Sequence, residues 1–258
     1  MANIYPIKED LSEVPFAELK VYEALEKLGK NFYIFHSVQW LKKTTKWAAT
    51  WKENDFLIIN RNLGALVLEV KGGDIEYTGT VFHQINTQTE EVSVLDPKKK
   101  KDPLSQAIDG AYYYRGVLEK IARATETRMA LDDRFPVEVA VWFPGCEIGK
   151  KIKKFPLAYR EAEQAVLDLN SFDKGPQAIY NVFDFYGSRE KVDITDEEFI
   201  KILEAIASDF ELITAPAVKK DELDHAFLKL TQEQTGLLDY ISEQRCATIQ
   251  GVAGTGKT

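Results

Sequence analysis

Two apolar segments separated by a short polar turn constrain the fold more than any other part of the sequence. Residues 55–60 and 65–71 are each long enough to form a strand, and residues 61–64 between them, Arg-Asn-Leu-Gly, are typical of a hairpin turn. Along the second segment successive side chains point to opposite faces, and both faces are mostly apolar. The segment is therefore predicted to be an interior strand of a sheet.

The register of this hairpin decides whether two acids lie together. If the connection has an odd number of residues, Ile59 lies opposite Ala65 and Asp55 lies opposite Glu69, on one face. An even number places the two acids on opposite faces. In the odd register their Cβ atoms are about 4.5–5.5 Å apart. Two carboxylates that close repel each other without a cation between them, and such oxygen ligands suit Mg²⁺ or Mn²⁺.

Lys71 follows Glu69 by two residues and therefore points to the same face. Its amine is expected to hold or activate a water, or to neutralise negative charge that develops on a phosphate. Gly72 and Gly73 lack side chains, so we expect them to let a polyanion approach the strand end. These features predict metal-assisted phosphodiester hydrolysis. The alternative is a structural ion pair between Glu69 and Lys71 at a sheet end.

The region around the hairpin resembles the nuclease-related domain (NERD), a branch of the PD-(D/E)XK nucleases, over roughly residues 14–145. The resemblance rests on the two strand segments, DFLII and GALVLEVKGG, on Glu18 in the first helix, and on the segment DPLSQ that ends at Gln106. It implies a restriction-endonuclease-like mixed sheet flanked by helices. It also implies Asp55 and Glu69 as metal ligands, Lys71 as the catalytic lysine, and Glu18 and Gln106 as supporting active-site groups.

A basic, tryptophan-rich insert over residues 40–51 departs from the family pattern, and we expect it to contact substrate. Lysines also form runs at residues 98–101 and 150–154. The formal net charge of −8 argues against a protein dedicated to coating duplex nucleic acid. Local basic patches can still hold nucleic acid on an acidic protein, although solvated loop lysines are the simpler interpretation of each run.

The other periodic segments predict an α/β fold. We expect helices over residues 15–30, 103–124, 159–169, 196–207, 221–230 and 231–240. We expect further strands over residues 32–38, 76–85, 92–95, 137–143 and 246–250. A change of composition near Asp193 predicts a domain boundary, because the residues that follow are acidic and helical.

Residues 251–258, GVAGTGKT, form a complete G-x-x-x-x-G-K-[ST] phosphate loop. In such a loop the glycines let backbone N–H groups wrap the phosphates of ATP, the lysine reaches the β and γ phosphates, and the threonine binds Mg²⁺. The predicted nucleotide-binding residues here are Gly251, Gly254, Gly256, Lys257 and Thr258. Because no helix follows the loop in this sequence, we expect the chain to be the front of a larger nucleoside triphosphatase.

The loop also resembles that of superfamily 1 helicases. The upstream segment LTQEQ resembles their adenine-reading motif, in which Gln234 clamps the adenine edge. A capping box, with Thr231 as N-cap and Gln234 at the third helical position, is a competing local explanation. The resemblance implies the truncated start of a P-loop, RecA-like domain. The segment carries no second acidic strand and no arginine finger, so it is not expected to hydrolyse ATP by itself.

The sequence therefore predicts a nuclease domain over residues 1–190, a helical linker over 191–228 and the truncated start of a helicase-like ATPase domain over 229–258. The whole protein is expected to couple an ATP-driven motor to cleavage of nucleic acid, with DNA as the expected substrate, in DNA repair or in defence against foreign DNA. One alternative is a catalytically inactive module of the same fold that binds DNA for a motor. Another is a phosphate-loop ATPase or kinase with an unrelated N-terminal domain.

Other sequence features indicate the cellular compartment and the roles of the cysteines and histidines. No apolar run approaches the ~20 residues that cross a bilayer, and no secretory leader opens the chain. Cys146 and Cys246 match no metal-ligand spacing, so a cytoplasmic protein with reduced thiols is expected. His36, His83 and His225 are isolated in the sequence, and no catalytic or metal role is predicted for them.

Overall fold

The structure is a computed structural model that describes residues 1–8, 11, 14–43, 49–79, 81–86, 89–96, 101–124 and 131–207. The chain divides into two compact units, Met1–Thr195 and Asp196–Thr258. In the second unit the structure describes one helix, α7 (Asp196–Ala207), as the sequence predicts. The helices and strand predicted beyond it, Gln234 and the phosphate loop lie outside the described residues.

The first unit is built on a six-stranded mixed sheet. The strands are β1 (Asn3–Tyr5), β2 (Phe32–Lys43), β3 (Ala49–Asn60), β4 (Gly64–Val70), β8 (Val137–Trp142) and β9 (Val166–Leu167), in the spatial order β1-β2-β3-β4-β8-β9. The β2–β3 and β3–β4 pairs are antiparallel, and the other neighbours are parallel. β4 is an interior strand, and all seven of its residues are buried.

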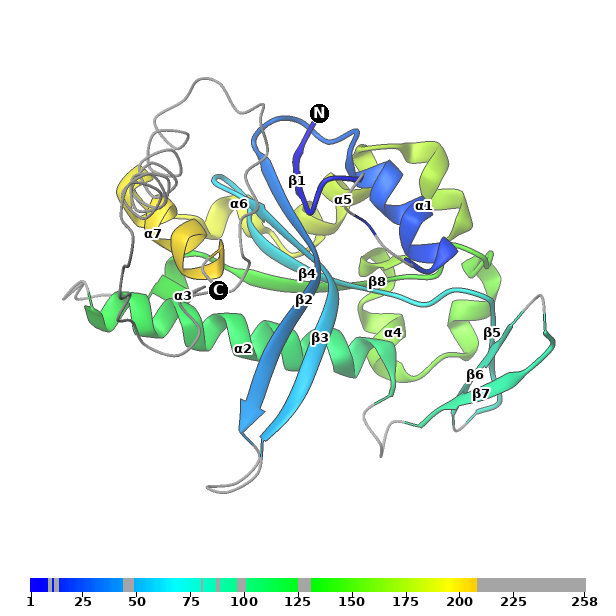
Figure 1. The fold of residues 1–258 in the computed structure, drawn as a ribbon. Helices are drawn as coiled ribbons and strands as arrows, with labels where there is room; N and C mark the ends of the chain where they lie inside the picture. Colours follow the sequence, from blue (N-terminus) through cyan, green and yellow to red (C-terminus); the bar gives the residue numbers. More distant parts are fainter. Residues whose placement is uncertain are drawn as a thin grey trace, which may run out of the picture. The chain divides into compact units, whose positions relative to one another are not determined.

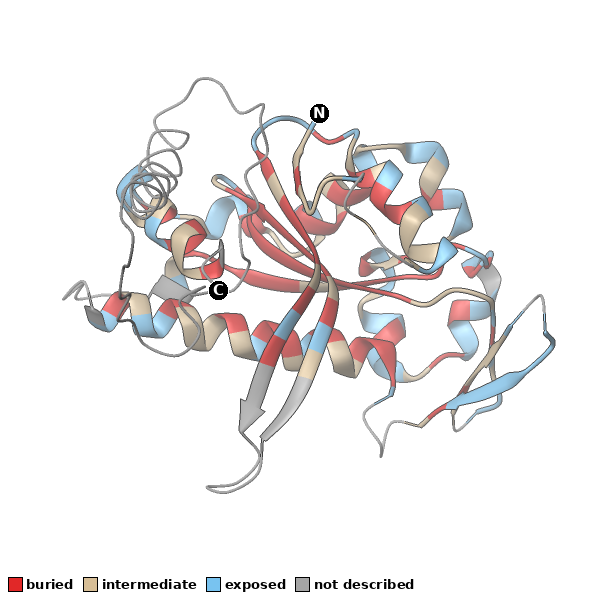
Figure 2. Cartoon of the chain, in the orientation of Figure 1, coloured by how far each residue is buried: buried red, intermediate tan, exposed pale blue. Residues whose placement is uncertain are grey.

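Helices cover both faces of the sheet, which confirms the α/β prediction (Figure 1). On one face α1 (Phe16–Leu25) and α5 (Gln177–Phe185) share an apolar core with β2, β3, β4 and β8. On the other face α2 (Pro103–Ala124) packs against β4 and β8. Figure 2 shows the buried residues following β3, β4 and β8 through the middle of these layers. This arrangement is compatible with a nuclease fold.

The structure confirms the predicted hairpin and has the odd register, which is one of the two alternatives that the sequence left open. Ile59 pairs with Ala65, and Leu57 pairs with Val67, as the odd-length connection requires. The turn also depends on Gly64, whose φ of 91° is in the left-handed region. A Cβ at Gly64 would lie 2.4 Å from the carbonyl oxygen of Pro136. The turn therefore packs closely against the residue that precedes β8.

A small second sheet follows the hairpin. It consists of β5 (Asp74–Tyr77), β6 (Phe82–Ile85) and β7 (Val92–Leu95). The single strand predicted over residues 76–85 is therefore wrong, because a turn separates β5 from β6 and lets them pair antiparallel. Ile75, Phe82 and Leu95 of this sheet pack into a core with Tyr159. The predicted strand at residues 92–95 is confirmed.

The single helix predicted over residues 159–169 is also wrong. The segment forms α4 (Leu157–Glu161), a 3₁₀ turn η4 (Glu163–Ala165) and then β9. Val166 pairs with Val141 of β8, so strand addition to the sheet overrides the helical periodicity of the sequence.

The remaining elements are α3 (Leu131–Arg134), η3 (Gly149–Lys154), η5 (Leu169–Lys174) and α6 (Ser188–Lys191). Among the described residues, none of the helices has the length and apolar character needed to cross a membrane.

Candidate active site

Two acids and one lysine meet where β4 ends beside the middle of β3. Asp55 and Glu69 lie one step beyond the last hydrogen-bonded pair of the hairpin, Phe56 with Leu68. Asp55 Oδ2 accepts a hydrogen bond of 2.6 Å from the N–H of Val70. Lys71 Nζ lies 2.5 Å from Glu69 Oε1 and 4.0 Å from Asp55 Oδ2. The three side chains that the sequence predicts to share one face therefore converge.

Burial makes this acid pair costly to ionise. The Glu69 side chain is 2% exposed and that of Asp55 is 16% exposed. Burial is the largest cause that raises the pKa of Asp55 from 3.8 to about 6, with Lys71 opposing and Glu18 adding to the shift. Burial and the neighbouring Asp55 raise the pKa of Glu69 from 4.5 to about 8, again against the effect of Lys71.

Lys71 is the cation that partly balances the pair. Burial alone would lower the pKa of Lys71, but Glu69 and Asp55 together raise it above its ordinary value. The amine therefore stays charged beside the two carboxyl groups. One oxygen of the site remains without a partner, because the buried Oε2 of Glu69 accepts no hydrogen bond from the described part of the chain.

Glu18 reaches the same strand end from the opposite layer. It lies in the first turn of α1, on the face of the sheet away from α2. The close approach of α1 depends on Gly72, because a Cβ there would lie 2.6 Å from the Cβ of Ala17. Glu18 Oε2 is 3.0 Å from Nε2 of His36, which is buried on β2.

Gln106 approaches from the start of α2. Asp102 caps this helix, since its Oδ1 accepts the N–H of Ser105 at 2.9 Å. The Tyr159 hydroxyl donates to Asp102 Oδ2 at 2.9 Å and accepts the N–H of Leu104 at 3.1 Å. Burial and the neighbouring Asp102 raise the pKa of Tyr159, so the phenol remains a neutral donor. The DPLSQ segment is thus a capped helix start that fixes the position of Gln106.

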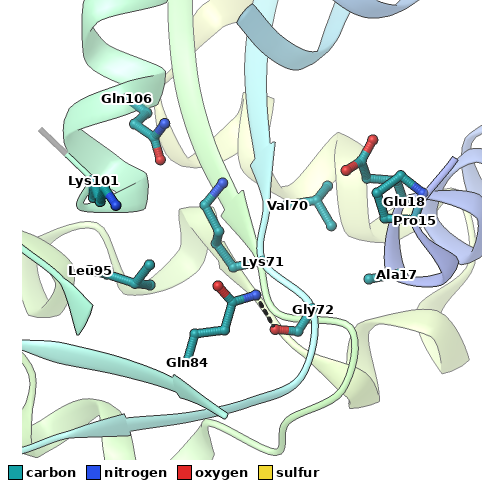
Figure 3. A pocket seen from close by; sticks show the side chains of 10 residues that line it. All are labelled: Pro15, Ala17, Glu18, Val70, Lys71, Gly72, Gln84, Leu95, Lys101 and Gln106. Atoms are coloured by element: carbon teal, nitrogen blue, oxygen red, sulfur yellow. Dashed lines mark hydrogen bonds between the residues drawn. The ribbon is translucent and has the colours of Figure 1, made fainter. Parts of the chain in front are cut away.

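These groups surround a pocket of about 410 Å³ at the strand ends (Figure 3). Figure 3 shows the side chains of Lys71 and Gln106 projecting into it, with Glu18 on the far side of Val70. The pocket is lined by Pro15, Ala17, Glu18, Val70, Lys71, Gly72, Gln84, Leu95, Lys101 and Gln106. Three of the five predicted catalytic residues line it directly, and Asp55 and Glu69 lie beside Lys71 at its edge.

Gln84 is a pocket residue that sequence reasoning missed. It lies on β6 of the small sheet, and its Nε2 donates a hydrogen bond of 2.8 Å to the carbonyl of Gly72. No local pattern marks it, because its position depends on how the small sheet folds back onto the end of β4. Its hydrogen bond ties this sheet to the residue that follows Lys71.

The glycines after Lys71 serve a purpose other than the predicted one. The Cβ position of Gly72 is occupied by Ala17, and a Cβ at Gly73 would lie 2.3 Å from the carbonyl oxygen of Ile85. Gly73 also has a φ of 77°. The prediction that the missing side chains leave room for a polyanion is therefore wrong. They let α1 and β6 close on the strand end, which brings Glu18 and Gln84 to the pocket.

The basic segments are only partly described. The insert over residues 40–51 forms the ends of β2 and β3, but residues 44–48 lie outside the described residues, as do residues 98–100 of the second lysine run. Lys101 lines the pocket. In the third run Lys151, Lys153 and Lys154 are exposed on η3.

The comparison with protein families agrees with this geometry. A family model described as the nuclease-related domain matches residues 15–144, about half of the chain. The chain belongs to this nuclease-related domain family. The match contains α1, β2, β3, β4, α2 and β8 in full, and it includes all five predicted catalytic residues. No curated protein and no solved structure matches the chain significantly.

Membership of the nuclease-related domain family supports a nuclease-type enzyme that acts on nucleic acid. The family match ends before residue 191 and gives no support for a helicase domain after it. Together with the α/β sheet and the convergent acid pair, the match locates the nuclease-related part of the chain in the first compact unit.

Proposed function

We propose that the first unit of the chain cleaves phosphodiester bonds of nucleic acid, with DNA as the expected substrate, using a divalent cation held by Asp55 and Glu69. The observation that carries the proposal is the buried acid pair. Asp55, Glu69 and Glu18 together outnumber Lys71, the described cation in contact with the pair. Such a site favours a further positive charge.

The residues fit Mg²⁺ or Mn²⁺ on two counts. The unpartnered Oε2 of Glu69 supplies a free oxygen ligand next to Asp55. Among the described residues no group of three or more His, Cys, Asp or Glu side chains is arranged as a complete metal cage. Mg²⁺ does not require one, because it is commonly bound through one or two carboxylates while waters and substrate phosphates complete its octahedral shell.

When bound, such a cation would polarise the scissile phosphate and lower the pKa of a bound water. Lys71 would neutralise the negative charge that develops on the phosphate oxygens. Because the neighbouring acids raise the pKa of Lys71, its ammonium favours this electrostatic role over removal of a proton from water. Gln106 and Glu18 flank the same pocket and would orient the phosphate and the attacking water.

Cleavage of defined substrates tests the proposal. The purified protein is incubated with supercoiled plasmid, single-stranded DNA and single-stranded RNA, with Mg²⁺ or Mn²⁺ or with EDTA. We expect cleavage only with a cation, and a loss of at least about 100-fold in Lys71→Ala. Lys191→Ala is the matched control, because that lysine pairs with Glu138 at the opposite end of β8.

The same assay addresses the inactive-module alternative. Salt-sensitive DNA binding without cleavage under any cation, unchanged by Lys71→Ala, would contradict the nuclease and support a binding module. Failure to bind any nucleic acid would contradict both.

We also propose that residues 229–258 begin an ATP-binding, helicase-like segment, so that the intact protein joins a motor to the nuclease in DNA repair or defence against foreign DNA. The support is the complete phosphate-loop sequence at residues 251–258. A chain that carries these residues together with a complete ATPase domain should show DNA-stimulated ATP hydrolysis that Lys257→Ala abolishes. Hydrolysis that survives this substitution would contradict the proposed loop function.

A further inference from the structure

His36 is a buried polar side chain that directly contacts a group of the candidate active site. Its Nε2 lies 3.0 Å from Oε2 of Glu18, and the histidine is 4% exposed. A carboxylate oxygen only accepts hydrogen bonds, so Nε2 is the donor and carries the proton. The hydrogen bond therefore determines the orientation of both partners.

The imidazole ring is held on both sides by aromatic packing. The ring of Phe56 on β3 is 4.8 Å away at 50°, and the ring of Tyr22 lies edge-on at 6.2 Å. Tyr22 is one turn beyond Glu18 on α1, and its hydroxyl is itself anchored by donating to the carbonyl of Pro6 at 2.9 Å. His36 thus occupies a slot between α1 and β3, with its Nε2 directed at Glu18.

The backbone next to His36 is distorted at the position that faces Asp55. The β2–β3 ladder pairs His36 with Phe56 and Val38 with Asn54, so Ser37 lies opposite Asp55. Ser37 has a φ of 58°, which is uncommon for a residue other than glycine. Strained backbone of this kind occurs at functional sites, where the surrounding structure maintains it.

Glu18 needs such a partner because its neighbours repel it. Its charge acts unfavourably on Asp55 and on Glu69, and its side chain is 20% exposed, so rotation towards water is open to it. We propose that His36 is a positioning residue that holds the Glu18 carboxylate at the pocket beside Asp55 and Glu69. The inference rests on the proposed nuclease function.

Three histidine variants test this role. His36→Leu removes the donor, whereas His36→Gln retains an N–H that can reach Glu18. His83→Leu is the control, because His83 lies on the small sheet and contacts Thr78 rather than Glu18. We expect kcat for DNA cleavage to fall about 10- to 100-fold in His36→Leu with little change in KM, to recover substantially in His36→Gln, and to be unchanged in His83→Leu.

A double-mutant cycle separates positioning from simple support of the fold. If His36 acts through Glu18, the double variant Glu18→Gln/His36→Leu loses no more activity than Glu18→Gln alone. Additive losses, or equal losses in His36→Leu and His36→Gln, would overturn the inference. Unchanged cleavage in His36→Leu would overturn it as well.

A second measurement does not depend on cleavage. The side-chain ¹⁵N resonances of His36 and His83 are recorded in the wild-type protein and in Glu18→Gln. We expect a shift of the His36 Nε2 resonance only. Such a shift would support the hydrogen bond even if the His36 variants fail to fold. An unmoved His36 resonance would overturn the inference. If the wild-type protein cleaves nothing while this shift is observed, the proposed function fails and the His36–Glu18 pairing stands.

Discussion

At the scale of single residues, Asp55 and Glu69 form a buried acid pair that is costly to ionise. The hairpin register forces the two carboxyl groups together in a place that water hardly reaches. Lys71 offsets part of the repulsion, but the pKa values of both acids remain raised, to about 6 and about 8. We therefore expect a bound cation to stabilise this acid pair further.

The raised pKa values of Asp55 and Glu69 predict that the stability of the metal-free protein depends on pH. The folded chain binds more protons than the unfolded chain between about pH 4 and pH 8, because the pKa of each acid is higher in the folded state. The stability that these acids contribute is therefore fully present at low pH and is lost as the pH rises through this window.

Thermal unfolding in EDTA at several pH values measures the effect. We expect the melting temperature to fall from pH 5 to pH 8 in the wild-type protein and to fall much less in Asp55→Asn/Glu69→Gln. Glu76→Gln on β5, where the acid is exposed, should keep the wild-type slope. An identical slope in the wild-type protein and the double variant would contradict the raised pKa values.

At the scale of elements, α2 connects the site to the rest of the sheet. Its middle packs on the hairpin at Gly110, where a Cβ would come within 2.6 Å of three side-chain atoms of Asn54. Asn54 is itself fixed, because it is buried and its Oδ1 accepts the indole N–H of Trp40 at 2.9 Å. Trp40 in turn stacks on Tyr113 of α2 at 4.8 Å.

Two glycines of α2 provide a matched test of this packing. Gly116→Ala adds a methyl group into open space and should raise the free energy of unfolding by about 0.5–1 kcal/mol, since alanine favours the helix. Gly110→Ala should lower it by about 1–3 kcal/mol, because the new Cβ collides with Asn54. Urea denaturation measures both values, and changes of the same sign would contradict the described contact.

The start of α2 gives a second prediction at this scale. Tyr159→Phe removes the hydroxyl that bonds both Asp102 and the N–H of Leu104 in a buried setting. We expect the free energy of unfolding to fall by about 1–3 kcal/mol and cleavage to weaken, because the helix start that carries Gln106 loosens. Tyr112→Phe is the control. Tyr112 lies at an exposed position of α2, so its substitution should change neither the free energy of unfolding nor cleavage. Unfolding free energies that match in the two variants would argue against the capping role.

At the scale of the whole molecule, the topology determines which residues meet. β4 lies between an antiparallel and a parallel neighbour, so its end is flanked by β3, by the end of β8, and by helices on both faces. Five separate chain segments therefore contribute to one pocket: the start of α1, the end of β4, β6, β7 and the region around the start of α2. Glu18 and Gln106 reach the pocket from opposite layers.

Local sequence patterns predict the parts of this structure that local interactions decide. The hairpin and α2 follow from alternation, turn residues and an Asp-Pro helix start, whereas the sequence left two registers open and the pairing of Ile59 with Ala65 decides between them. The contributions of Gln84 and His36 do not follow from local patterns, because each depends on packing between segments far apart in the chain. The error over residues 159–169 has the same origin, since two residues become a strand only by pairing with β8.

Binding of Mn²⁺ followed by isothermal titration calorimetry at pH 8 tests the cation site most directly. We expect one saturable site in the wild-type protein and in Glu76→Gln. The affinity should weaken at least about tenfold, or about 1.4 kcal/mol, in Glu69→Gln and in Asp55→Asn. No binding to the wild-type protein, or equal affinity in Glu69→Gln, would contradict a cation site built by this acid pair.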